Sequence, residues 1–101
     1  MNLLFQSRYF SSYQSDRDRR FIFDFGHKNI KLSFCQLLAF RQNVLSIDLD
    51  AHFTGENKHG LEILVLCNKE HILVFDTHQV IDLKDFMKGT FAMLELNSLV
   101  V

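Results

Sequence analysis

The sequence predicts an α+β fold: a single sheet of five or six mainly antiparallel strands, with two helices on one face and Phe rings between the layers. Two observations support this prediction. A strand–turn–strand–helix pattern occurs twice in tandem, and Phe alternates with other residues along the first hairpin. The chain has 101 residues, 48% of them apolar, and contains eleven Phe, which suits one domain with a substantial core. We expect a single domain, 1–101, with pseudo-repeats at about 1–45 and 46–101.

The first hairpin is marked by alternating Phe residues. Phe21, Phe23 and Phe25 occupy every second position, which places their rings on one face of a strand. Gly26 supplies the backbone freedom that a turn requires. The alternation resumes in residues 29–33, so we expect a return strand there.

The second hairpin joins residues 61–67 to residues 71–76 through a polar turn at 68–70. Residues 61–67 are nearly all apolar, which favours a central position in the sheet. Residues 54–60 are polar and include two glycines, which predicts the loop that leads into this hairpin.

One further strand is expected ahead of each hairpin. Residues 3–10 could form the first, followed by a polar surface connection over 11–19. In residues 46–53 apolar and polar side chains alternate strictly, which predicts a half-buried strand. With both strands present, the chain consists of two βββα units that share one core, because a lone hairpin with one helix buries too little surface to be stable.

A helix is expected at the end of each unit. Apolar residues recur at helical spacing from Phe34 to about Val44, and Ser33 with Gln36 has the spacing of a capping box. The second helix is expected from about Asp82. Gly89 interrupts it and indicates a kink, a close contact with another helix or the end of the helix.

These packing motifs carry a resemblance to a known family. The Phe25-Gly26 turn before Ile30-x-Leu32, the capped Leu37-x-x-Phe40 helix, and the later hairpin leading into Leu83-x-x-Phe86 resemble a family of small uncharacterised bacterial proteins, a domain of unknown function with duplicated strand–strand–helix units. The resemblance covers about residues 20–96. It implies the fold and a cytoplasmic setting, and no activity. Relatives with paired Cys near the start differ from this chain, so a metal role there does not carry over.

Composition excludes several classes of protein. The apolar content and the near-zero net charge of −1 exclude a disordered tail. No apolar run approaches the roughly 20 residues of a membrane span, so we expect no membrane partner. Cys35 and Cys67 are the two cysteines and lie in apolar stretches, where a free thiol behaves as a small buried hydrophobe. We therefore expect a cytoplasmic protein without disulfides.

The most enzyme-like pattern is Asp48-x-Asp50-x-His52. On a strand these three side chains would share one face, about 6–7 Å apart, which could suit a hard cation or an acid–base pair. The preferred interpretation is the solvated face of a half-buried strand. The five histidines show none of the short paired spacings of zinc sites. We predict no catalytic residue, no metal and no cofactor, and keep this trio as a candidate surface site.

A basic patch at Arg17, Arg19 and Arg20 is the second candidate. Residues 1–31 have an excess of positive charge, which suits an acidic partner such as nucleic acid. Phe21 and its neighbouring rings beside these arginines superficially resemble an RNA-binding sheet. Ordinary solvated charge, and rings buried in the core, are the preferred interpretations.

The function expected from these observations is a small, non-catalytic structural or protein-interaction module. Near-zero charge and exposed strand edges favour self-association, so the expected partner is a second copy, as a homodimer, or another protein. A nucleic-acid-binding module that uses the basic N-terminal segment is one alternative. A small enzyme or ligand binder centred on Asp48, Asp50 and His52 is the other.

Overall fold

The computed structural model describes residues 2–15, 17–54, 60–66 and 71–99. The described residues form these elements in chain order: β1 (Asn2–Gln6), β2 (Ser11–Gln14), β3 (Phe21–Asp24), β4 (Asn29–Leu32), α1 (Phe34–Leu45), α2 (Leu49–Thr54), β5 (Leu61–Leu66), β6 (His71–Asp76) and α3 (Thr77–Leu99). Within the described chain, no helix is both long enough and apolar enough to cross a membrane. The predicted α+β class is confirmed.

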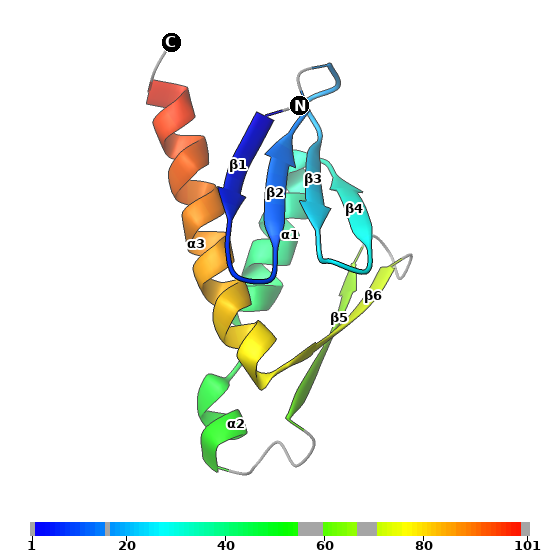
Figure 1. The fold of residues 1–101 in the computed structure, drawn as a ribbon, viewed down its shortest axis with the longest axis vertical. Helices are drawn as coiled ribbons and strands as arrows, with labels where there is room; N and C mark the ends of the chain where they lie inside the picture. The colour runs from blue at the N-terminus through cyan, green and yellow to red at the C-terminus, as the bar shows by residue number, and fades with distance from the viewer. Residues whose placement is uncertain (1, 16, 55–59, 67–70, 100–101) are drawn as a thin grey trace.

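The first four strands form an antiparallel sheet in the order β1-β2-β3-β4. Phe23 pairs with Ile30 and Phe21 pairs with Leu32, and all four side chains are buried on the same face. Helices α1 and α3 lie against this face, as Figure 1 shows. The alternation in the sequence therefore identified both the strands and the face that the helices cover.

The prediction of one sheet of five or six strands is wrong. Strands β5 and β6 form a separate two-stranded antiparallel sheet, in which Ile63 pairs with Val74. The free edge of β3 is taken by β2, a segment whose composition predicted a surface loop. The second hairpin instead packs on the core through one face, with Leu73 and Phe75 fully buried there (Figure 1).

The segment before the first hairpin contains two strands instead of one. Strand β1 ends at Gln6, and the amide of Ser7 donates to the carbonyl of Phe10 to close a turn. Strand β2 escaped prediction because the inward-facing position at its centre is Ser12, a polar residue. Its buried hydroxyl forms a hydrogen bond of 2.8 Å with the hydroxyl of Thr90 on α3, which satisfies both groups inside the core.

The turn between β1 and β2 is tied to α3 by Asp82. One carboxylate oxygen of Asp82 accepts from the Ser7 hydroxyl at 2.6 Å and from the Tyr9 amide at 3.0 Å. The other accepts from the amide of Arg8 at 3.3 Å. These hydrogen bonds join the β1–β2 turn to α3. Asp82 therefore lies inside the helix and not at its start, where it was predicted.

The predicted strand over 46–53 is also wrong. Ser46 is the C-cap of α1, and the short helix α2 follows from Leu49. Asp48 starts that helix, because its carboxylate accepts from the amides of Asp50 at 3.0 Å and Ala51 at 3.4 Å. The alternating pattern was misleading because an Asp side chain just before a helix accepts hydrogen bonds from the first amides of that helix. These bonds favour the helix over an extended strand. Phe53, at the end of the pattern, is 68% exposed.

Both long helices begin at a capping box. At α1 the amide of Gln36 donates to the Ser33 hydroxyl and the Gln36 side chain accepts from the Ser33 amide, as predicted. At α3 Asp76 and Gln79 exchange the equivalent two bonds, at 2.8 and 3.0 Å. This second box starts α3 five residues before the predicted position, at Thr77. Gly89 does not end α3, which continues to Leu99. The glycine lies against the ring of Phe5 on β1.

Phe rings join the two sheets into one core. Phe10 lies at the centre, with ring centroids 5.6 Å from those of Phe25, Phe75 and Phe86. Phe23 packs on Phe86 at 5.3 Å. Edge-to-face contacts of this kind favour a fixed arrangement beyond the area that they bury. The core is therefore shared by both hairpin–helix segments.

Candidate functional site

Asp50 and His52 lie on α2 and Asp48 immediately precedes it, so the strand geometry that would place the three on one face does not occur. Asp48 accepts hydrogen bonds from backbone amides of the helix start. His52 points into the protein, and its side chain is fully buried. Within the described residues, no group of three His, Cys, Asp or Glu side chains is arranged to hold a metal ion.

His52 instead lies between two residues that the sequence pattern did not connect with it. Its Nε2 is 2.9 Å from a carboxylate oxygen of Glu62 on β5, and its Nδ1 is 2.9 Å from the hydroxyl of Thr77 on α3. The Thr77 hydroxyl in turn lies 3.4 Å from the carbonyl of Gly60. A carboxylate, an imidazole and a hydroxyl in series are the groups of a nucleophilic triad.

Burial decides against catalysis by this triad. Both ring nitrogens of His52 are occupied, and the side chain has no exposed surface through which a substrate could reach it. The arrangement instead holds α2, β5 and the start of α3 together. No local signal in the sequence pairs His52 with Glu62 or Thr77, because the contacts span 10 and 25 residues.

The remaining polar candidates are dispersed. His27 and His78 are exposed on different elements, and Nδ1 of His71 is buried with no hydrogen-bond partner in the structure. His59, Cys67 and the predicted 68–70 turn lie outside the described residues. The expectation that Cys35 is buried is wrong: its thiol is free and exposed near the start of α1.

The basic patch lies in the connection between β2 and β3. Arg17, Arg19 and Arg20 are all exposed there, and Arg19 adopts a left-handed backbone conformation with φ of 54°. Asp18 lies among them and forms an ion pair with Lys31 on β4. The hydrogen bond from Lys31, with a second from Ser15, lowers the pKa of Asp18 from 3.8 to about 2. The carboxylate therefore stays charged and offsets part of the positive charge of this segment.

The aromatic rings beside the basic patch are not available to nucleic acid. Phe21, Phe23 and Phe25 are all buried under the helices. Stacking of bases requires exposed ring faces. The interpretation that these rings belong to the core is confirmed. They therefore cannot stack on bases beside the basic patch.

The outer side of the β5–β6 sheet is an exposed apolar surface. Five aliphatic side chains point outward from it, each between 45% and 64% exposed, and we call this surface the hairpin face: Leu61, Ile63, Val65, Ile72 and Val74. In the register of the sheet, Ile63 lies opposite Val74 and Val65 opposite Ile72. The alternate residues of both strands face the core, so the hairpin has apolar side chains on both sides.

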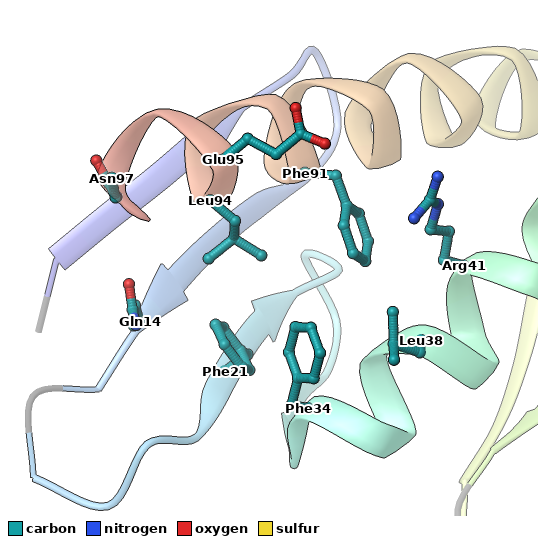
Figure 2. Close-up of a pocket in the computed structure, with 9 residues that line it drawn as sticks. All are labelled: Gln14, Phe21, Phe34, Leu38, Arg41, Phe91, Leu94, Glu95 and Asn97. Atoms are coloured by element: carbon teal, nitrogen blue, oxygen red, sulfur yellow. The ribbon is translucent and has the colours of Figure 1, made fainter. Parts of the chain in front are cut away.

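A groove lies between α1 and α3 and has a volume of about 640 Å³. Nine residues line it, and Figure 2 shows them: Gln14, Phe21, Phe34, Leu38, Arg41, Phe91, Leu94, Glu95 and Asn97. We call it the α1–α3 groove. Its volume is within the range of small-molecule sites, roughly 300–1,000 Å³. No motif in the sequence indicated it, because its residues come from β2, β3, α1 and α3.

Compared with models of known families, with curated proteins and with solved structures, the chain gives no match.

Proposed function

We propose that the protein is a non-catalytic interaction module that self-associates through the hairpin face. The observation that supports this proposal is the concentration of five exposed aliphatic side chains on one side of a two-stranded sheet. A contiguous apolar patch of several hundred Å² on a folded domain typically marks an interaction surface. Water is removed from all five side chains only if a second apolar surface covers them.

A second copy is the partner that this surface fits best. Its central pairs, Ile63 with Val74 and Val65 with Ile72, present only aliphatic groups, so the face is complementary to itself. A two-fold axis through the hairpin would place the same patch of each copy against the other. The net charge of −1 adds little repulsion between copies.

The size of the hairpin face determines how tightly we expect the two copies to bind. A standard stable interface covers about 800 Å² on each partner, and five partly exposed aliphatic side chains supply only part of that area. We therefore expect a weak dimer, with a dissociation constant on the order of tens of micromolar. We also propose a cytoplasmic setting, which the exposed free thiol of Cys35 supports because reducing compartments keep such thiols free.

Sedimentation equilibrium on the full chain from about 5 to 500 µM tests the proposal. We expect a monomer–dimer equilibrium that Ile63→Lys abolishes, since a charge at the centre of an apolar contact must be desolvated. Leu96→Lys is the matched control, because Leu96 is 54% exposed on α3, away from the hairpin face. A wild-type protein that stays monomeric throughout, or an Ile63→Lys variant that dimerises as wild type does, would reject the proposal.

A further inference from the structure

The α1–α3 groove has two apolar walls. Phe91 and Leu94 extend into it from α3, and Phe21, Phe34 and Leu38 face them from β3 and α1 (Figure 2). The rings of Phe21 and Phe34 pack together, with centroids 6.1 Å apart. Phe34 and Leu38 remain 51% and 40% exposed despite their place in the wall. The helices thus leave a slot whose sides are already arranged for an apolar ligand.

Polar groups lie at the ends of the groove. Arg41 closes one end, and Gln14 and Asn97 lie at the other (Figure 2). The guanidinium carbon of Arg41 is 4.5 Å from the centre of the Phe91 ring, which fixes the cation beside the apolar wall. Among the described residues, no carboxylate forms an ion pair with Arg41. Its N–H groups remain available to donate two parallel hydrogen bonds to a carboxylate.

We propose that this groove binds an elongated amphipathic carboxylate. The carboxylate group would be held by Arg41, the hydrocarbon body would lie between the Phe and Leu walls, and the far end would reach the amides of Gln14 and Asn97. The guanidinium of Arg41, for which no ion pair is found among the described residues, selects the class of ligand. A single fixed guanidinium beside an apolar slot is complementary to one negative charge on an apolar body.

Glu95 restricts the ligand further. It lines the same groove but is already engaged in an interaction of its own. Its negative charge opposes a second anionic group on the ligand, so monocarboxylates are favoured over dicarboxylates and phosphate esters. Neutralising it should strengthen binding: we expect Glu95→Gln to bind the probe more tightly than wild type does.

Octanoate is the probe, and 1-octanol and octylammonium are its neutral and cationic controls. Each is titrated into the ¹⁵N-labelled full chain, and binding is followed by amide chemical shifts. We expect octanoate to bind at least tenfold more tightly than either control, with shifts at Leu38, Phe91 and Leu94. Equal affinity for the three ligands, no binding, or shifts centred on the hairpin face would overturn the proposal.

Two variants that each remove one positive charge test whether Arg41 causes the preference for octanoate. Arg41→Gln should remove the tenfold preference for octanoate. Lys88→Gln is the matched control, because Lys88 lies in a neighbouring hollow beside Arg41 and does not line the groove. If Arg41→Gln keeps the preference, or Lys88→Gln loses it to the same extent, the proposal fails. The groove and the hairpin face are separate surfaces, so this test stands whether or not the protein dimerises.

Discussion

Asp18 shows how one ion pair alters the charge of the basic connection. Its folded-state pKa of about 2 lies below the ordinary value of 3.8. Its contribution to stability is therefore fully present above pH 3.8 and is lost as the pH falls through about 2. We expect Lys31→Met to raise the pKa of Asp18 toward 3.8, as measured by ¹³C NMR titration of the carboxyl group.

Lys28→Met is the control for that titration, since it removes the same charge from the turn between β3 and β4 without removing the partner of Asp18. An Asp18 pKa that moves equally in both variants would show that general charge, and not the hydrogen bond from Lys31, lowers it.

His52 is the second residue whose surroundings define its role. If it holds α2, β5 and α3 together, His52→Ala should lower the free energy of unfolding by about 1–3 kcal/mol, because Glu62 and Thr77 each lose one hydrogen bond. Urea denaturation measures this change. His27→Ala, at an exposed turn residue, should alter stability by less than about 0.5 kcal/mol. Equal, small effects in both variants would contradict the structural role of His52.

At the scale of single elements, Gly89 shows why a helix can require glycine in its interior. A Cβ at this position would overlap the ring of Phe5. Gly→Ala inside a helix normally stabilises it by up to about 1 kcal/mol. We expect Gly89→Ala to destabilise the protein by about 1–3 kcal/mol instead, because the ring must move within a packed layer. Thermal or urea unfolding shows whether the variant is less stable or more stable than wild type.

A double-mutant cycle with Phe5→Leu identifies the cause. A smaller side chain at position 5 should reduce the cost of Gly89→Ala, with a coupling above about 0.5 kcal/mol. If Gly89→Ala stabilises the wild-type background, or if the two changes are additive, the contact between α3 and β1 is not what requires glycine.

Local patterns identified the elements with strong periodicity. The strands β3 to β6 and the helix α1 lie within one or two residues of their predicted limits, because alternation, an apolar run or a capping box marks each of them. The start of α3 was missed, although Asp76 and Gln79 have the same capping spacing as Ser33 and Gln36. Strand β2 could not be recognised locally, since Ser12 becomes an inward residue only when Thr90 lies above it.

The whole molecule depends on pairings that no local pattern contains. Strand β2 occupies the edge of β3, and β5 and β6 pair with each other in a sheet that is separate from the first. Neither the place of β2 nor the separation of the two sheets has a local signal in the sequence. The candidate sites follow the same rule. The Asp48–His52 pattern was visible in the sequence and was dispersed by folding, whereas the hairpin face and the α1–α3 groove exist only once distant segments meet.

The separation of the second sheet also explains why its outer face is open. The helices that bury the four-stranded sheet reach only one side of β5–β6, and the aliphatic residues on the other side have no cover within the described chain. In the proposed dimer a second copy would cover this face, and the residues that line the α1–α3 groove are not part of it.

An isotope-filtered NOE experiment tests the self-association most directly. A mixture of ¹³C-labelled and unlabelled full-length protein, at a concentration well above the expected dissociation constant, reports only contacts between copies. We expect intermolecular NOEs among the methyl groups of Ile63, Val65, Ile72 and Val74. The absence of intermolecular NOEs at millimolar concentration, or NOEs confined to α1 and α3, would contradict the account.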